Sequence, residues 1–112
     1  MPTDRIVILD DANFEEKVIR GIYEKVLVQF WAAWSPPCRL VSPVVDAIAN
    51  EFNQKMVVGR LDIDDSHRVT YMYNIRVVPT LMLFDNGVEV HRKTGVVNES
   101  TLTYLINRYL EA

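Results

Sequence analysis

The 112 residues, of which 49% are hydrophobic and 24% charged, suffice for one domain with a buried core and exclude a disordered or disulfide-framed chain. Twelve basic residues are scattered among fifteen acidic ones, for a net charge of −3. This excludes nucleic acid as an expected partner, because binding it needs concentrated positive charge.

The beginning of the chain does not resemble a secretory signal. Acids stand on both sides of a four-residue apolar run in MPTDRIVILDDANFEE, whereas a signal has a basic start and a longer apolar core. No apolar stretch approaches the roughly 18 residues of a membrane span. We therefore expect a cytoplasmic protein with no membrane partner.

Hydrophobic periodicity predicts strands and helices in the order βαβαβαββα. The predicted elements are a strand at 5–9, a helix at about 13–20, a strand at 25–32, a helix from the proline pair to 52, a strand at 56–64, a short helix at 66–74, two strands within 80–95 and a helix at 98–112. Asn13, with Glu16 three residues later, has the pattern of a capping box for the first helix. Asn86 followed by Gly87 predicts a tight turn between the last two strands.

This order predicts an α/β protein. Alternating strands and helices give a parallel core with right-handed crossovers, and the final hairpin adds antiparallel strands. We expect one central mixed sheet with helices on both faces, forming a single domain over residues 1–112.

Three stretches resemble the thioredoxin family in sequence, order and separation: VLVQFWAAWSPPCRLVSP (26–43), NIRVVPTLMLFDNG (74–87) and KTG (93–95). The resemblance covers essentially the whole chain and implies the thioredoxin fold. It also implies thiol-disulfide chemistry, in which a first cysteine attacks a substrate disulfide and a second one, three residues later, resolves the mixed disulfide.

The chain departs from the family at three positions. Ser35 stands where the family has the attacking cysteine, so Cys38 has no partner and the dithiol cycle cannot run. Gln29 stands where thioredoxins commonly have a buried aspartate that relays protons, and an amide can only hydrogen-bond. Pro36 replaces a glycine, which makes the active-site turn stiffer.

The family's polypeptide-binding positions are retained. By resemblance, the peptide-binding groove comprises Trp34, Pro36, Pro37, Val78, Pro79 and Gly95. The resemblance implies that Val78 pairs with a bound peptide through its backbone, that Pro79 follows a cis peptide bond, and that Gly95 keeps the groove open. An extended polypeptide is therefore the expected partner.

Ser35 and Cys38 also have structural interpretations. Ser35 followed by Pro36 is a good helix start, with the serine oxygen accepting a hydrogen bond from the amide of Cys38. Cys38 is expected to be an inert thiol buried under the turn. A slowly reactive thiol is the alternative.

No cofactor or metal site is predicted. Asp62, Asp64 and Asp65 follow a strand and precede a helix, where capping and solvation explain acids better than a metal or acid-base site. His67 and His91 lie far apart, with no Cys or acid at ligand spacing. Trp31 is expected in the core and Trp34 on the surface, which leaves Trp34 as the contact residue.

Three hypotheses for function remain open at this stage. The first is a redox-impaired family member, expected to be monomeric, that binds polypeptide through the groove. The second is a protein disulfide reductase in which Ser35 is an engineered replacement of cysteine; its partners would then include a thioredoxin reductase. The third is a redox sensor or peroxidase that uses Cys38 alone.

Overall fold

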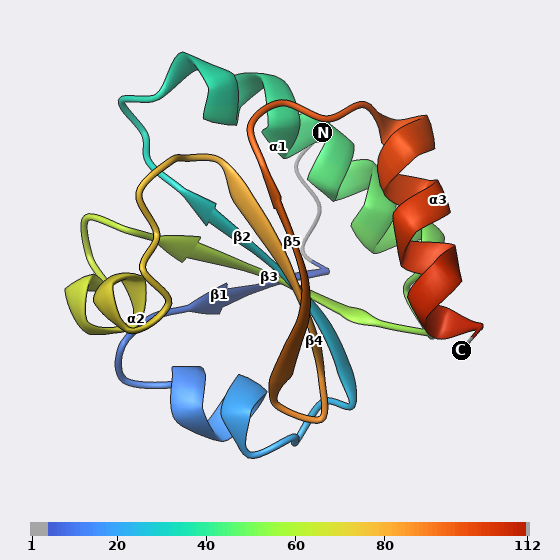
Figure 1. Cartoon of the computed structure of the whole chain (residues 1–112), viewed down its shortest axis with the longest axis horizontal. Coiled ribbons are helices and arrows are strands. Elements are labelled where there is room, and N and C mark those ends of the chain that lie inside the picture. Colours follow the sequence, from blue (N-terminus) through green and yellow to red (C-terminus); the bar gives the residue numbers. More distant parts are fainter. Residues whose placement is uncertain (1–4, 112) are drawn as a thin grey trace.

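The computed structural model describes residues 5–111 as a five-stranded mixed sheet with helices on both faces (Figure 1). The strands are β1 (Ile6–Leu9), β2 (Lys25–Trp31), β3 (Val57–Asp62), β4 (Thr80–Asp85) and β5 (Val88–Thr94). The helices are the π-helix η1 (Glu15–Ile19) and the α-helices α1 (Pro36–Glu51), α2 (His67–Met72) and α3 (Glu99–Leu110). The predicted element order is confirmed.

The sheet has the order β1-β3-β2-β4-β5, with β2 at its centre. β2 pairs parallel with β3 and antiparallel with β4, and β5 closes the hairpin. Residues 26–30 of β2 are all buried because the strand packs against helices on both of its faces.

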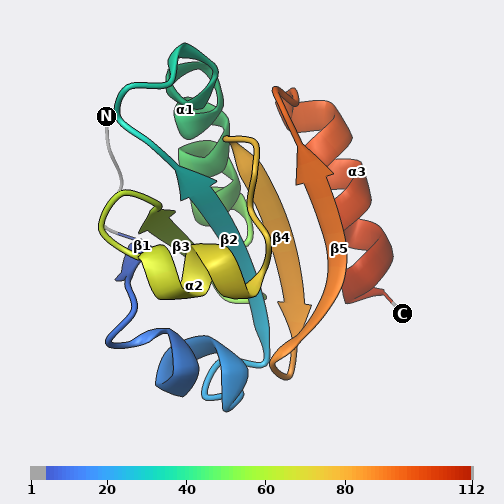
Figure 2. The ribbon, with the colours of Figure 1, turned by 60° about the vertical axis from the view of Figure 1, so that its left-hand side comes forward.

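The two faces of the sheet contribute to two separate cores. Helices α1 and α3 cover one face, and η1 and α2 cover the other (Figure 2). Leu27 of β2 belongs to the α1–α3 core, whereas Val26, Val28 and Phe30 belong to the core beneath η1 and α2. Successive side chains of a strand point to opposite faces, so Gln29 points the same way as Leu27, toward α1.

The hairpin between β4 and β5 turns as its sequence predicts. Asn86 and Gly87 have φ angles of 50° and 85°, which are the positive values of a tight hairpin turn. A Cβ added to Gly87 would lie 2.0 Å from the carbonyl oxygen of Ile19, so the turn also needs glycine for close packing against η1.

The start of the first helix differs from the prediction. Its N-cap is Phe14, and the Asn13–Glu16 capping box does not form. Asn13 instead accepts a hydrogen bond from the amide of Asp10 at 2.9 Å, and the Asp10 carboxylate accepts from the amides of Ala12 and Asn13. The side chains of Asp10 and Asn13 thus accept hydrogen bonds from backbone amides of the loop between β1 and η1. The last predicted helix ends at Leu110, and residue 112 lies outside the described residues.

Helix α2 is capped by a residue that is distant in sequence. The Asp11 carboxylate accepts hydrogen bonds from the amides of Arg68, at 3.0 Å, and Val69, at 2.9 Å. Burial raises the pKa of Asp11, but these two bonds and the charges of Arg68 and His67 outweigh it, so the pKa lies below its ordinary value of 3.8. Ser66, the N-cap by position, makes no capping bond with its side chain.

No helix in residues 5–111 is both long and apolar enough to cross a lipid bilayer.

Asp11→Ala should lower the free energy of unfolding by about 1 kcal/mol at pH 7, because two amides of α2 lose their acceptor. The ionised carboxylate is the stabilising form, so its contribution is present above pH 3.8 and is lost as the pH falls through the lower folded-state pKa. Urea unfolding at pH 7 and at about pH 3 measures this, with Glu24→Ala as a control for the loss of one exposed acid. A deficit that does not shrink on acidification would contradict the capping role.

Candidate active-site face and the buried network beneath it

The predicted active-site residues begin helix α1. Ser35 is the N-cap, with extended backbone angles, and its Oγ accepts a hydrogen bond from the amide of Cys38 at 3.4 Å. Pro36 and Pro37 open the helix, where a missing N–H leaves no donor unsatisfied. The predicted capping interaction is therefore confirmed, and the serine hydroxyl serves the helix start.

Cys38 is the only cysteine of the chain and is buried, with 1% of its surface exposed. Its carbonyl oxygen accepts a hydrogen bond from Ser42 Oγ at 2.9 Å. The next turn of α1 thus fixes the backbone at Cys38. The position three residues earlier carries a hydroxyl, which cannot form a disulfide, and burial of Cys38 restricts access of a second substrate to its sulfur.

The predicted groove residues come from three segments at the same end of the sheet. In the sheet register Phe30 lies opposite Thr80, and Thr80 lies opposite Thr94. This places Pro79 next to the end of β2 and next to Gly95, whose amide donates to the Pro79 carbonyl oxygen at 2.9 Å. We define the active-site face by the exposed Trp34, Pro36 and Pro37, the half-buried Val78 and Gly95, and the buried Pro79.

The backbone of the active-site face has the features expected from the sequence. The Val78–Pro79 peptide bond is cis. Gly95 has a φ of 83°, and a Cβ added there would meet nothing within 4 Å, so the space above this residue is open. Among the described residues, neither the N–H nor the carbonyl of Val78 has a hydrogen-bond partner. A backbone donor and acceptor without partners are what an added extended peptide needs.

Trp34 stands out from the active-site face, with 63% of its surface exposed. Its indole Nε1 donates to Asp64 Oδ2 at 2.9 Å, which holds the ring in place. The Asp64 amide in turn donates to Asp62 Oδ1 at 2.9 Å. Asp62 and Asp64 therefore shape the loop after β3, as expected for acids at a strand end, and a fixed aromatic ring costs little conformational entropy on binding.

A buried polar network lies beneath the start of α1. Gln29 is fully buried; its Nε2 donates to Ser42 Oγ at 3.2 Å, and its Oε1 accepts from Arg60 Nε at 2.6 Å. Arg60 also donates to the Ser42 carbonyl at 3.3 Å and pairs with Asp46 at 3.2 Å. Through Ser42 the network connects β2 and β3 to the carbonyl of Cys38.

This network explains how a buried amide is accommodated at position 29. A buried amide must satisfy both a donor and an acceptor, and Ser42 and Arg60 supply the two partners. The charge of Arg60 is balanced by Asp46, which is partly exposed. The fully buried polar residues of the described chain are Gln29, Ser35, Ser66 and Thr80. None of them is an acid, so no buried carboxylate is available to move a proton near Cys38.

The remaining predicted candidates do not assemble into a second reactive centre. His67 is exposed at the start of α2, whereas His91 contacts Tyr109 on α3. Within residues 5–111, no three His, Cys, Asp or Glu side chains gather where they could hold a metal ion.

The prediction that Trp31 belongs to the core is wrong. Trp31 is half-buried and lines a cavity of about 530 Å³ beside the loops that follow β1 and β3. Trp31 is the last residue of β2, and both end residues of this strand are half-buried although the five residues between them are buried. The sequence pattern did not indicate Arg60 either, because only the register of Gln29 with Arg60 reveals the pair.

Gln29→Leu should lower the free energy of unfolding by about 2 kcal/mol, because it removes the acceptor of the partly buried Arg60 guanidinium and the donor to Ser42. Arg60→Met should also destabilise the protein, but the double variant should lose less than the sum of the two, with a coupling of about 1–2 kcal/mol. Urea unfolding of the four proteins measures the coupling. Additive losses would show that Gln29 and Arg60 do not act as a pair.

Comparison with known proteins agrees with this geometry. The family model described as Thioredoxin matches residues 5–108. The chain is 45% identical over 100 residues to a thioredoxin of Porphyra purpurea, covering 89% of this chain and 92% of that protein. It is 40% identical over 102 residues to a thioredoxin of Synechocystis sp., covering 91% and 94%. It is 37% identical over 107 residues to the chloroplastic M-type thioredoxin of Zea mays, covering 96% of this chain and 64% of that longer protein. The sequence, the fold and these relatives together place the chain in the thioredoxin family, whose chemistry is thiol-disulfide exchange.

Proposed function

We propose that this chain binds extended polypeptide at the active-site face and does not turn over disulfides. The observation that carries the proposal is Ser35 at the position of the attacking cysteine, with its Oγ accepting from the amide of Cys38. The hydroxyl supports the helix start, and no second thiol exists to complete a dithiol.

The geometry of the active-site face supports polypeptide binding. An extended chain laid beside Val78 would find a free N–H and a free carbonyl, as in the addition of a strand to a sheet edge. The exposed ring of Trp34 offers apolar contact area next to it. Gly95 borders open space, since a Cβ built there would meet nothing within 4 Å.

The network around Gln29 supports the absence of turnover. In a dithiol cycle a carboxylate near the resolving thiol speeds the loss of its proton, and the amide of Gln29 cannot accept that proton near neutral pH. Its acceptor oxygen is already occupied by Arg60 at 2.6 Å. The proposed binding role requires only that this network hold the start of α1 in place.

The competing roles for Cys38 have less support. A one-cysteine peroxidase or sensor needs an accessible thiolate, whereas Cys38 is buried with 1% exposure. A disulfide reductase with an engineered Ser35 would share every contact described above. That hypothesis therefore depends on whether the natural gene encodes serine or cysteine at residue 35. It predicts full activity once a cysteine is restored, and only in that case would a thioredoxin reductase be a partner.

We also propose that the chain acts as a monomer in the cytoplasm. The chloroplast is the alternative location, because relatives such as the Zea mays protein are chloroplastic. Localisation of the protein with an antibody or a fluorescent tag in its own cells distinguishes the two.

The unmodified chain should reduce a protein disulfide no faster than the chemical reductant alone, because Ser35 cannot attack sulfur. Ser35→Cys should raise the rate at least tenfold, since it supplies a nucleophile at a helix start above Cys38. Ser35→Ala is the matched control and should stay at background. The assay compares the three proteins at equal concentration with excess dithiothreitol, and turnover by the unmodified chain well above the reductant alone would contradict the proposal.

A further inference from the structure

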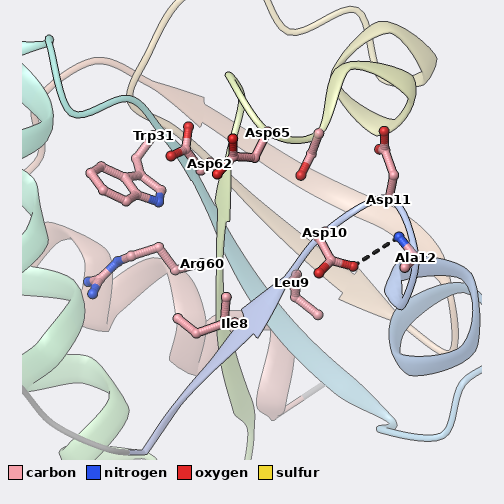
Figure 3. Close-up of a pocket in the computed structure, with 10 residues that line it drawn as sticks. Ile8, Leu9, Asp10, Asp11, Ala12, Trp31, Arg60, Asp62 and Asp65 are labelled. Carbon is pink, nitrogen blue, oxygen red and sulfur yellow. Dashed lines mark hydrogen bonds between the residues drawn. The ribbon is translucent and has the colours of Figure 1, made fainter.

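The cavity lined by Trp31 lies at the carboxyl ends of β1 and β3 (Figure 3). We call it the edge pocket and define it by Ile8, Asp10, Trp31, Asp62, Asp65 and Ser66. Its volume of about 530 Å³ is in the range of small-ligand sites. β1 is an edge strand of the sheet, so the pocket opens at the side of the molecule.

The hydrogen-bond donors around the edge pocket are already used. Arg60 is bound to Gln29, Ser42 and Asp46, and Figure 3 shows its guanidinium pointing away from the aspartates. The amides of Arg68 and Val69, at the start of α2, donate to the Asp11 carboxylate. An anionic ligand would therefore find no free cation or helix terminus here.

The acceptors around the edge pocket are largely free. Among the described residues, Asp10 and Asp62 each use only Oδ1, in bonds with amides of their own loops. The Asp65 carboxylate makes no hydrogen bond or ion pair within residues 5–111, whereas the Asp65 amide donates to the Asp62 carbonyl oxygen at 3.2 Å. Ser66, which also lines the pocket, is fully buried, and its Oγ has no hydrogen-bond partner among the described residues. An unsatisfied buried hydroxyl is costly, so Ser66 indicates a missing partner.

The size and lining of the pocket select the kind of cation. The described acids do not converge as a metal-binding group, so a bare metal ion would not contact enough ligands at once. The lining also has an apolar part, formed by Trp31 and by Ile8, which is 68% exposed. A cation on an aliphatic stem matches both surfaces, since the stem packs against apolar groups while the charged end reaches the carboxylates.

The loop after β3 connects the edge pocket to the active-site face. Asp62 lines the pocket and accepts from the amide of Asp64, and Asp64 holds the indole of Trp34. A polypeptide lying against Trp34 thus passes close to the acids of the pocket. On this basis, and resting on the proposed function, we propose that the edge pocket binds the charged end of a lysine or arginine side chain of the polypeptide partner.

The first test uses a probe too small to depend on the active-site face. Nα-acetyl-lysine N-methylamide is titrated into the ¹⁵N-labelled protein, with the norleucine analogue as a neutral probe of the same shape. We expect saturable shifts at Asp10, Asp65, Ser66 and the Trp31 indole with the lysine probe, at least fivefold tighter than with the norleucine probe. Equal responses to the two probes, or shifts that never saturate, would overturn the proposal.

Matched variants distinguish binding at the edge pocket from a general effect of the protein's negative charge. Asp62→Asn/Asp65→Asn should weaken the lysine probe at least fivefold, whereas Glu51→Gln/Glu99→Gln, with the same loss of charge, should change it less than twofold. Ser66→Ala should weaken the probe about threefold without lowering the stability of the free protein, because its hydroxyl has no partner to lose. Equal effects of the two double variants would show that the pocket is not the site.

A third arm identifies the source of the cation. n-Butylamine carries the same ammonium on a similar stem but lacks the peptide groups. We expect the blocked lysine to bind at least as tightly as n-butylamine. A tenfold preference for n-butylamine would show that the pocket binds a free amine and would contradict a polypeptide side chain as its ligand. If the lysine probe binds and no unfolded polypeptide does, the proposed function fails while the pocket remains a cation site.

Discussion

The pairing of Gln29 with Arg60 is the constraint on which the active-site end of this molecule depends. Gln29 sits fully buried in the central strand of the sheet, and its carbonyl oxygen accepts from the neighbouring strand's arginine at 2.6 Å. The side-chain Nε2 of Gln29 donates to Ser42 Oγ, and Ser42 Oγ donates to the carbonyl oxygen of Cys38. The helix that begins at Ser35 is thereby attached to the sheet through polar contacts that must all be satisfied together.

This network and the active-site face have different chemical consequences. Thiol-disulfide exchange by this family needs two thiols and a group that accepts their protons. This chain has one thiol, Cys38, and an amide, Gln29, in place of such a group. The exposed Trp34 and the free backbone groups of Val78 do not depend on either requirement. Binding and turnover can therefore separate, and the fold is retained because the buried amide of Gln29 finds partners in Ser42 and Arg60 while Ser35 caps α1.

The sequence predicted the order of elements because each strand and helix has a strong local signal. The apolar run at 25–32 and the Asn86-Gly87 turn are examples, as is the Ser35-Pro36 helix start. Interactions between distant segments were not predictable in the same way. Asp11 caps α2 although Asp11 and Val69 are 58 residues apart in sequence, and this contact is apparent only once β1 and β3 are paired.

Local signals also misled where several polar residues compete. Asn13 and Glu16 have the spacing of a capping box, but Asp10 takes the amide of Asn13 and turns the loop back on itself. Trp31 continues an apolar strand and still reaches a cavity, because it is the last residue of β2 and only half-buried there. The family positions of the active-site face were found by resemblance, whereas the edge pocket has no sequence motif and is known only from the structure.

The central claim is binding of polypeptide at the active-site face, and one titration tests it most directly. Reduced and carbamidomethylated α-lactalbumin, a permanently unfolded chain without free thiols, is added to the ¹⁵N-labelled protein. The account predicts shifts concentrated at Trp34, Val78 and Gly95, with affinity at least tenfold weaker in Trp34→Ala and unchanged in Tyr104→Ala, which removes an exposed aromatic from α3. No binding, or equal affinity of the two variants, would contradict it.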